Sequence, residues 1–498
     1  MPQALLGKQL LDVIAIGMYN TPLMTLREYV QNSVDSIDEA VESGTLSTSK
    51  GHVKIQLDGA SRTILIEDNG AGIRARNVEG HLLTIGGSAK RAATNRGFRG
   101  IGRLGGLGYC DALLFETKAA GDDAVSCVCW DGVALRKELG ASDAADAVDV
   151  IRRIVKVTQR RIAKGDPDHY FRVTLRGVHR FHNDILMDMR NVYRYLSQVA
   201  PVPYDPEQFS FVDKIEEHLG SLAGFRHYSL SLNGRPVYRP YADTIEVSPG
   251  RNDRMRDVTL FDVPDSSGGT IGKGWYGITG FLASLPAACS MRGVRLRQGN
   301  IEIANEYFFA EYLTERRFCT WHIGEVHFRL GLPPNGRRDG FHNTPDYEKA
   351  LEFFLVLGKH LSKLCRDSSK ERASTLGVTR ELDTAEQYLE DAIFLDADHV
   401  ASMQETLLRR MGLLRKRLST RKPQNGLLER IEVLEGRLRD LSKDAALLLH
   451  RLDGRRLRHA EPKELLLDVF RRLLADGDHI LIETKLKTIL EPYLTSEP

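Results

Sequence analysis

Glu28, Asn32 and Asp35 have side chains and spacing that suit chemistry with water and a hard metal ion. They recur at four- and three-residue intervals within LREYVQNSVDSIDEA, residues 26–40. A helix over this stretch would project all three side chains from one face. A carboxylate can orient and deprotonate a water molecule, and an amide oxygen is a ligand that Mg²⁺ accepts. We therefore expect this face to belong to a site rather than to a core.

The helix that must position these side chains is predicted from its hydrophobic stripe. Four apolar residues follow the helical period on the neighbouring face: Leu26, Val30, Val34 and Ile37. Such a stripe lets the helix pack while its polar face is turned toward a cavity.

A second polar motif follows a predicted strand. The apolar run at residues 64–66 leads into the sequence Asp68-Asn-Gly70-Ala-Gly72. Its two glycines let the backbone turn sharply and come close to a ligand. We expect Asp68, Gly70, Gly72 and Ile73 to form the second wall of the cavity.

A glycine-rich and cationic stretch comes third, in TIGGSAKR at residues 84–91 and GFRGIGRLGGLGYCD at residues 97–111. Backbone N–H groups in such a segment suit phosphate oxygens, so we expect a mobile lid; an ordinary surface loop is the alternative. The predicted phosphate contacts are Ser88, Lys90, Gly100, Ile101, Gly102, Gly105, Gly106 and Gly108.

These three motifs, in this order, resemble the nucleotide-binding signature of the GHKL ATPases, the superfamily of gyrase, the 90-kDa heat-shock chaperones, histidine kinases and mismatch-repair clamps. The resemblance implies a Bergerat-type α/β sandwich that binds ATP and Mg²⁺. It implies Glu28 as the catalytic base, Asn32 as the Mg²⁺ ligand and Asp68 as the acceptor for the adenine amine, with Asp35 supporting the pocket wall. The final glycines are shifted by one residue from the usual pattern, which leaves the phosphate-contacting amides open.

One strand departs from the family pattern. HYFRVTLRGV, residues 169–178, occupies the place of the Gly-Thr-x-Val-x-Leu strand whose threonine helps to bind adenine. Val173 and Leu175 match, but Tyr170 and Phe171 stand where Gly and Thr would be. The second adenine contact is therefore open.

A second domain is expected to follow, with a hairpin turn at Asn233-Gly234 near its start. Further on, the sequence Leu332-Pro-Pro-Asn-Gly-Arg-Arg-Asp339 resembles a motif in the middle domain of the 90-kDa heat-shock chaperones. Arg338 falls on the arginine that reaches the γ-phosphate in that family, and Arg337 is the adjacent alternative. A loop with solvated arginines is what composition alone would give.

The last 120 residues have mainly helical patterns. Two hydrophobic seams, at residues 400–418 and 427–448, flank a Pro/Gly-containing turn and predict an antiparallel coiled-coil hairpin. From residue 401 to 460, roughly 15 Lys/Arg oppose roughly 7 Asp/Glu. This excess is typical of a solvated face, so nucleic acid is a possible partner but not the favoured one.

The expected fold class is α+β, with three parts: a GHKL ATP-binding domain (1–212), an α/β middle, transducer-like domain (213–376) and an all-α C-terminal region (377–498). The chain has 498 residues, 27% charged, with a net charge of +2, which is ordinary for a globular protein. The six cysteines include no C-x-x-C pair, and neither an export signal nor a membrane span is found. We expect a cytoplasmic protein.

The expected function is a heat-shock-chaperone-like ATPase in which ATP drives lid and domain closure. A homodimer through ATP-dependent N-terminal contacts and the C-terminal helices is expected, with a protein client or operon partner that the sequence does not identify. One alternative is a GHKL nucleic-acid clamp in repair or phage defence. Another is a nucleotide-binding scaffold without turnover.

Overall fold

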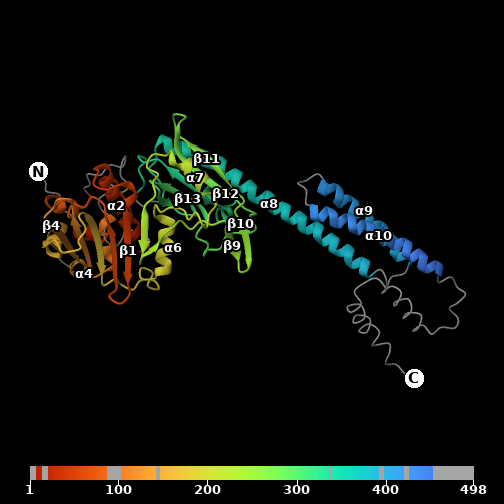
Figure 1. Cartoon of the computed structure of the whole chain (residues 1–498), viewed down its shortest axis with the longest axis horizontal. Coiled ribbons are helices and arrows are strands. Elements are labelled where there is room, and N and C mark those ends of the chain that lie inside the picture. The colour runs from red at the N-terminus through yellow and green to blue at the C-terminus, as the bar shows by residue number, and fades with distance from the viewer. Residues whose placement is uncertain are drawn as a thin grey trace, which may run out of the picture. The chain divides into compact units, whose positions relative to one another are not determined.

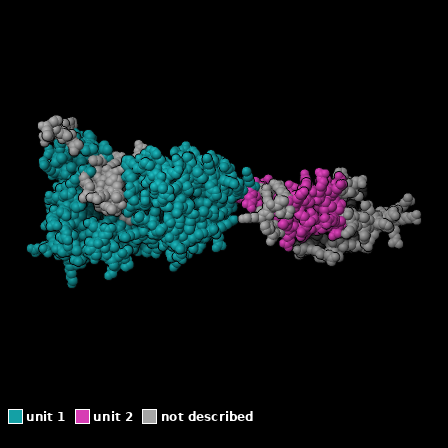
Figure 2. Space-filling view, turned by 90° about the horizontal axis from the view of Figure 1, so that it is seen from above, with its two compact units in different colours: residues 1–370 teal, residues 371–498 magenta. Residues whose placement is uncertain are grey.

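The computed structural model describes residues 7–13, 21–86, 102–141, 146–335, 339–391, 397–419 and 425–451. The chain divides into two compact units, residues 1–370 and 371–498, which Figure 2 shows in teal and magenta. Unit 1 contains every described strand, whereas the described part of unit 2 is helical. The predicted α+β class is therefore confirmed.

An eight-stranded sheet forms the first half of unit 1, in the order β5-β4-β3-β6-β2-β1-β7-β8. All neighbouring strands are antiparallel except β1 and β7, which are parallel. The strands are β1 (His52–Asp58), β2 (Thr63–Asp68), β3 (Ala112–Lys118), β4 (Ala124–Asp131), β5 (Val155–Arg161), β6 (Tyr170–Arg176), β7 (Ser229–Leu232) and β8 (Arg235–Pro236).

Helices cover one face of this sheet. They are α1 (Gln9–Asp12), α2 (Met24–Glu42), α3 (Val78–Leu82), α4 (Gly132–Gly140), α5 (Ala147–Ile154) and α6 (Met189–Val199), and short 3₁₀ segments include η2 (Thr48–Lys50), η3 (Ala75–Asn77) and η4 (Gly102–Tyr109). The predicted stripe of α2 is buried in one core with Ile64 and Ile66 of β2. Burying aliphatic side chains on both elements fixes α2 against the strand that leads to Asp68.

The hairpin predicted at Asn233-Gly234 forms, and it extends the first sheet. Leu57 on β1 donates its amide to Asn233 Oδ1 at 2.7 Å, and Asn233 Nδ2 donates to the Leu57 carbonyl at 3.1 Å. The turn residue thus continues the pairing of β1 with β7. Strand order of this kind follows from tertiary contacts that the hairpin pattern does not encode.

A five-stranded sheet forms the second half of unit 1, in the order β11-β12-β15-β13-β14 (Figure 1). The strands are β11 (Asp257–Pro264), β12 (Thr270–Ile278), β13 (Gly293–Gln298), β14 (Ile301–Ala304) and β15 (Ile323–Phe328), with a separate pair β9 (Thr244–Ser248) and β10 (Arg251–Arg254). One face packs on α7 (Val212–Gly220) through Trp275, and the other packs on α8 (Pro345–Asp391) through Tyr276. The short segments η5 (Phe308–Glu311) and η6 (Arg316–Trp321) lie between β14 and β15.

Three helices pack together in unit 2. The end of α8 contributes Leu382, α9 (Ala397–Ser419) contributes Met411 and α10 (Asn425–Arg451) contributes Ile431 to one core. Gln404 donates to the Leu438 carbonyl at 2.6 Å, and Arg415 pairs with Glu432 at 2.7 Å. Partner numbers on α10 fall as those on α9 rise, so the two helices run antiparallel as the sequence predicted. The third helix was not predicted as part of this packing, since its apolar positions precede the two seams. No helix in the described ranges is long and apolar enough to cross a membrane.

Candidate functional site

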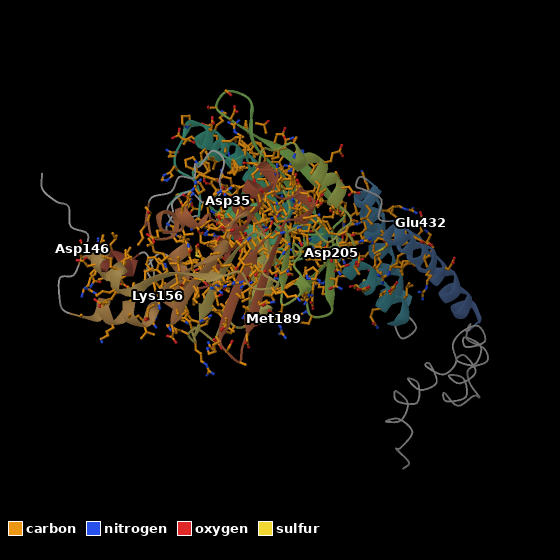
Figure 3. All side chains as sticks on the ribbon, turned by 60° about the vertical axis from the view of Figure 1, so that its left-hand side comes forward. Asp35, Asp146, Lys156, Met189, Asp205 and Glu432 are labelled. Atoms are coloured by element: carbon orange, nitrogen blue, oxygen red, sulfur yellow. The ribbon has the colours of Figure 1, made fainter. Side chains whose placement is uncertain are left out.

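The first motif lies on α2. Glu28 and Asp35 are 4% and 2% exposed, and Asn32 is partly exposed, so this polar face is almost enclosed (Figure 3 labels Asp35). Buried carboxylates are costly unless something compensates their charge. Their burial on a helix that also carries a complete hydrophobic stripe indicates a site.

Arg27 supplies a positive charge beside Glu28. Its Nη2 lies 3.6 Å from Glu28 Oε1, and both side chains are almost completely buried. Sequence reasoning did not single out Arg27, because adjacent helical residues point about 100° apart and are not expected to meet. The sequence does show two unlike charges next to each other at the start of the motif, as Arg27-Glu28.

The second motif follows β2 and contacts α2. Asp68 is 1% exposed, and its Oδ1 accepts a hydrogen bond from the Gly70 amide at 2.9 Å. The Ala71 amide donates to the Ser36 carbonyl on α2 at 3.0 Å. A Cβ at Gly70 would lie 2.2 Å from Ser36 Oγ, so only glycine permits this approach.

Gly72 and Ile73 continue the loop against β3. Gly72 has φ +66°, and a Cβ there would lie 2.1 Å from the Lys118 carbonyl oxygen. The Ile73 amide donates to Thr117 Oγ1 at 2.8 Å, and the Thr117 hydroxyl donates to the Tyr170 carbonyl at 3.1 Å. The loop is thus fixed to both α2 and β3.

Thr117 belongs to the candidate site, and the sequence did not single it out. In the sheet register, Phe171 on β6 lies opposite Asp68 on one side and opposite Thr117 on the other. The sequence resemblance puts Phe171 where the family pattern has threonine, and the buried Thr117 hydroxyl stands one strand away. A buried threonine in an apolar strand was the available signal, but only the register shows which strand neighbours which.

The end of the third motif also contacts α2. The Tyr29 hydroxyl accepts a hydrogen bond from the Gly106 amide at 3.0 Å and donates one to the Arg103 carbonyl at 3.1 Å. A Cβ at Gly106 would lie 2.3 Å from the Tyr29 oxygen. Gly102, Gly105, Gly106 and Gly108 all lie in η4, and the Gly106 amide is engaged by Tyr29.

Several predicted residues lie outside the described part of the chain. These are Ser88, Lys90, Gly100 and Ile101 of the glycine-rich stretch, and Arg337 and Arg338 of the second domain.

The second sheet comes close to the base of α2. Burial raises the pKa of Tyr195 on α6, whose charged neighbours are Arg27 and Glu28 on α2 and Glu302 on β14. Glu302 in turn accepts a hydrogen bond from Arg295 at 2.7 Å. Charged residues of the two halves of unit 1 therefore both act on Tyr195.

A fully buried ionic cluster links the two halves more firmly. Glu325 on β15 pairs with Arg297 at 2.6 Å and with Arg239, and it accepts hydrogen bonds from Tyr204 at 2.8 Å and Tyr241 at 3.0 Å. Burial by itself raises the pKa of Glu325, but the two arginines outweigh it and hold that pKa well below its usual range.

The same arginines bond to the last turn of α6 and to the chain that follows it. Arg239 Nε donates to the Val202 carbonyl at 3.0 Å, and Arg297 donates to the Gln198 carbonyl. Removing Glu325 would leave two buried arginines without their counter-charge. The cluster therefore fixes the second sheet to the end of the first half of unit 1.

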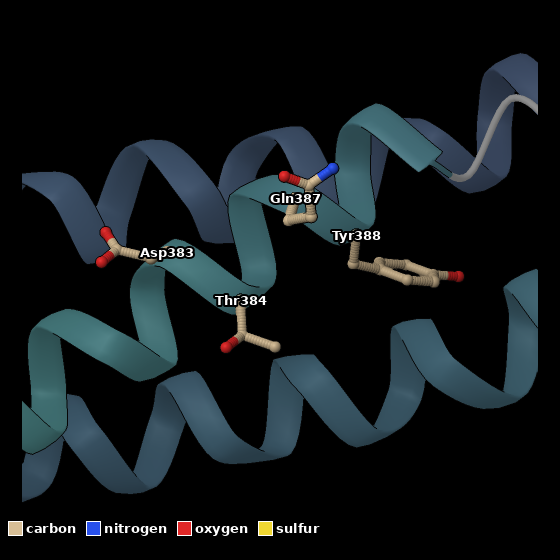
Figure 4. Close-up of a pocket in the computed structure, with 4 residues that line it drawn as sticks. All are labelled: Asp383, Thr384, Gln387 and Tyr388. Carbon is tan, nitrogen blue, oxygen red and sulfur yellow. The ribbon is translucent and has the colours of Figure 1, made fainter.

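A surface pocket on α8 in unit 2 contains none of the three predicted motifs. It is lined by Asp383, Thr384, Gln387 and Tyr388, four residues of a single helix (Figure 4). Asp383 is engaged by Arg430 at 2.6 Å. None of the lining residues was predicted as a site residue.

Comparison of the sequence with known protein families identifies the class of the first half of unit 1. Residues 20–152 match the family model described as histidine kinase-, DNA gyrase B-, and HSP90-like ATPase. The matched range includes α2, the loop after β2 and η4. The chain therefore carries a GHKL ATPase domain, as the motifs predicted.

Part of the chain is also similar to bacterial proteins named chaperone protein HtpG. The chain is 30% identical over 140 residues to chaperone protein HtpG of Polaromonas naphthalenivorans, covering 24% of this chain and 22% of the relative. It is 30% identical over 133 residues to HtpG of Bacillus licheniformis (24% and 21%), and 28% identical over 169 residues to HtpG of Paraburkholderia xenovorans (30% and 25%). Each match spans about a quarter or less of the relative's length.

Proposed function

We propose that this protein is an Mg²⁺-dependent ATPase of heat-shock-chaperone-like type, in which ATP binding closes a lid over the nucleotide. The observation that carries the proposal is the meeting of three motifs at α2. Ser36 accepts a hydrogen bond from the loop after Asp68, and Tyr29 accepts one from Gly106 in η4. A single helix therefore adjoins both the adenine-side loop and the end of the phosphate-side stretch.

Glu28 acts in this proposal as the base that orients and deprotonates water, and Arg27 holds its carboxylate in place. Asn32 offers its carbonyl oxygen to Mg²⁺, and Asp35 supports the wall behind it. When bound, Mg²⁺ neutralises charge on the phosphates. A single oxygen ligand from Asn32 fits Mg²⁺, because this ion takes few protein ligands and is also held by the phosphate oxygens of the substrate.

Asp68 accepts the hydrogen bond from the adenine amine. Gly70, Gly72 and Ile73 form the wall beside the base, because their close packing on α2 and β3 leaves the backbone as the surface that a ligand meets. Thr117 stabilises this wall from behind through the Ile73 amide.

The phosphate-binding group comprises Ser88, Lys90, Gly100, Ile101, Gly102, Gly105 and Gly108, with Arg338 or Arg337 at the γ-phosphate. In this proposal Gly106 anchors the stretch to Tyr29 instead of binding phosphate. The Glu325 cluster favours the glycine-rich stretch as the moving part, and it disfavours a large closure between the two halves of unit 1. The proposal also includes that the protein forms a homodimer, acts on a protein client and is located in the cytoplasm.

The test is steady-state ATP hydrolysis with nucleotide binding measured in parallel. Glu28→Ala and Glu28→Gln are expected to bind ATP but to lose about 10²–10⁴-fold in turnover. Asp68→Asn is expected not to bind. Glu39→Ala, an exposed carboxylate on the same helix, is the matched control and should leave both unchanged. Wild-type protein that binds ATP but whose slow turnover is unchanged by Glu28→Ala would instead support the nucleotide-binding scaffold.

A nucleic-acid clamp is the second candidate, supported by exposed cations on α9 and α10: Arg409, Arg410, Lys416, Arg437 and Arg439. It predicts binding to duplex DNA that weakens steeply as salt rises. Absence of binding to the full chain at low salt would rule it out.

A further inference from the structure

Arg103 in η4 stands at the base of the glycine-rich stretch. Its Nη2 donates to the Thr84 carbonyl, and its own carbonyl accepts the Tyr29 hydroxyl at 3.1 Å. Thr84 is the first residue of the glycine-rich stretch, and Arg103 lies within its second part. The side chain of Arg103 therefore joins the two parts of the stretch at a point fixed to α2.

Within the described ranges, no carboxylate pairs with this guanidinium. Arg103 Nε is shielded from solvent and has no hydrogen-bond partner among the described residues. Burial lowers the pKa of Arg103 to about 10. Residues 87–101 contain no Asp or Glu, so the adjoining sequence supplies no counter-charge.

An uncompensated, partly buried guanidinium is costly unless an anion completes it. Guanidinium groups bind phosphate with paired, geometrically specific hydrogen bonds, in which Nε takes part. Tyr29, which holds the Arg103 backbone, lies on α2, the helix that carries Glu28 and Asn32. A phosphate chain bound along α2 is thus the anion that this position suits.

We propose that Arg103 binds the phosphate chain of the nucleotide, with a phosphate oxygen accepting the hydrogen bond from Nε. This inference rests on the proposed function, because it assumes that the site takes a nucleotide. It assigns a side-chain contact in a stretch for which the sequence suggested Ser88, Lys90 and backbone amides. The bond to Thr84 orients the guanidinium, while the Tyr29 bond fixes its backbone.

The experiment compares ATP with adenosine, which lacks phosphates, on the full chain. Affinities are measured by titration calorimetry for ATP and by ligand-observed NMR for adenosine. Arg103→Ala is expected to weaken ATP binding about ten- to a hundredfold, because charged hydrogen bonds are lost, and to change adenosine binding less than about threefold. Arg103→Lys, which keeps the charge without the fork, should fall between Arg103→Ala and wild type. Arg152→Ala removes an exposed arginine from α5 and should leave both affinities unchanged.

Unchanged ATP affinity in Arg103→Ala would overturn the inference. Equal losses for ATP and adenosine would also overturn it, since they would assign Arg103 only a structural role at the base of the stretch. If wild-type protein binds adenosine and ATP with equal affinity, the phosphates contribute nothing to binding. That result would also overturn the inference about Arg103, although recognition of adenine would stand. If wild type binds neither, the proposed function itself fails. Thermal unfolding of each variant checks folding, and Arg103→Lys keeps the test valid if the alanine variant does not fold.

Discussion

The hydroxyl of Tyr29 lies 3.0 Å from the amide nitrogen of Gly106, and this bond joins the helix that carries Glu28 to the end of the glycine-rich stretch. The contact is close because Gly106 has no side chain: a Cβ would lie 2.3 Å from the tyrosine oxygen. Two motifs separated by more than 70 residues therefore share one side-chain anchor. Any movement of the stretch must begin from, or break, this bond.

Gly106→Ala should destabilise the protein by about 1–3 kcal/mol, because the new methyl group overlaps the Tyr29 hydroxyl. Tyr29→Phe removes that oxygen, so Gly106→Ala should cost less in the Tyr29→Phe background. A double-mutant cycle on denaturant unfolding measures the coupling, which should be about 1 kcal/mol or more. Simple additivity of the two costs would show that the contact is absent.

Gly72→Ala should abolish ATP binding and destabilise unit 1. Its φ of +66° is strained for alanine, and the Cβ would meet the Lys118 carbonyl oxygen at 2.1 Å, a backbone atom that cannot rotate away. Gly59→Ala is the matched control, because no atom lies within 4 Å of a Cβ there. Calorimetric ATP titration distinguishes the two. Normal binding by Gly72→Ala would mean that the loop after Asp68 is not part of the site.

Glu325→Gln should cost about 3–5 kcal/mol in unfolding free energy, because it leaves Arg239 and Arg297 buried without their counter-charge. Glu352→Gln on α8 breaks an exposed pair with Lys349 and should change stability by less than about 1 kcal/mol. Chemical denaturation of the full chain compares them. Similar small effects would show that the cluster does not join the two halves of unit 1.

The stability of unit 1 should fall in mild acid because of His322. Burial lowers its pKa to about 3, whereas the unfolded chain protonates histidine near pH 6.5. The unfolded state therefore binds the additional proton between these values, and the unfolding free energy falls by about 1.4 kcal/mol per pH unit as pH drops below 6.5. His327, with its pKa lowered to about 4, acts in the same direction.

His322→Gln should reduce this slope when unfolding midpoints are compared between pH 7 and pH 5. The control is His81→Gln, an exposed position on α3. A slope that is unchanged by His322→Gln would show that the ring is protonated in the folded state.

Leu382→Ala should loosen the three-helix core of unit 2, since the side chain is fully buried and its loss costs about 2–5 kcal/mol. Leu376→Ala, at a position 59% exposed on the same helix, should have little effect. Hydrogen exchange in α9 and α10 is the measurement. Unaltered protection of α9 and α10 in Leu382→Ala would show that the hairpin is stable without α8.

The sequence alone determined the local elements of the candidate site. Helical spacing placed Glu28, Asn32 and Asp35 on one face of α2. The sharp turn expected at the glycines after Asp68 forms, with Gly72 at φ +66°, and the approach of these glycines to a ligand stays a prediction. The hairpin at Asn233-Gly234 and the antiparallel pairing of α9 with α10 were also predictable. The helix face, the glycine turn and the hairpin depend on residues close together in the sequence, so local sterics and periodicity are sufficient for them. The pairing of α9 with α10 was predictable because a short turn joins two hydrophobic seams.

Tertiary structure alone decided which of these elements meet. The bonds of Tyr29 to Gly106, of Thr117 to Ile73 and of Arg103 to Thr84 join residues that no short-range rule relates. The extension of the first sheet by β7, and the burial of Glu325 between two arginines, likewise depend on which surfaces pack. Long-range pairing is selected by the total burial and charge balance of the folded chain, and these quantities have no signature at any single position.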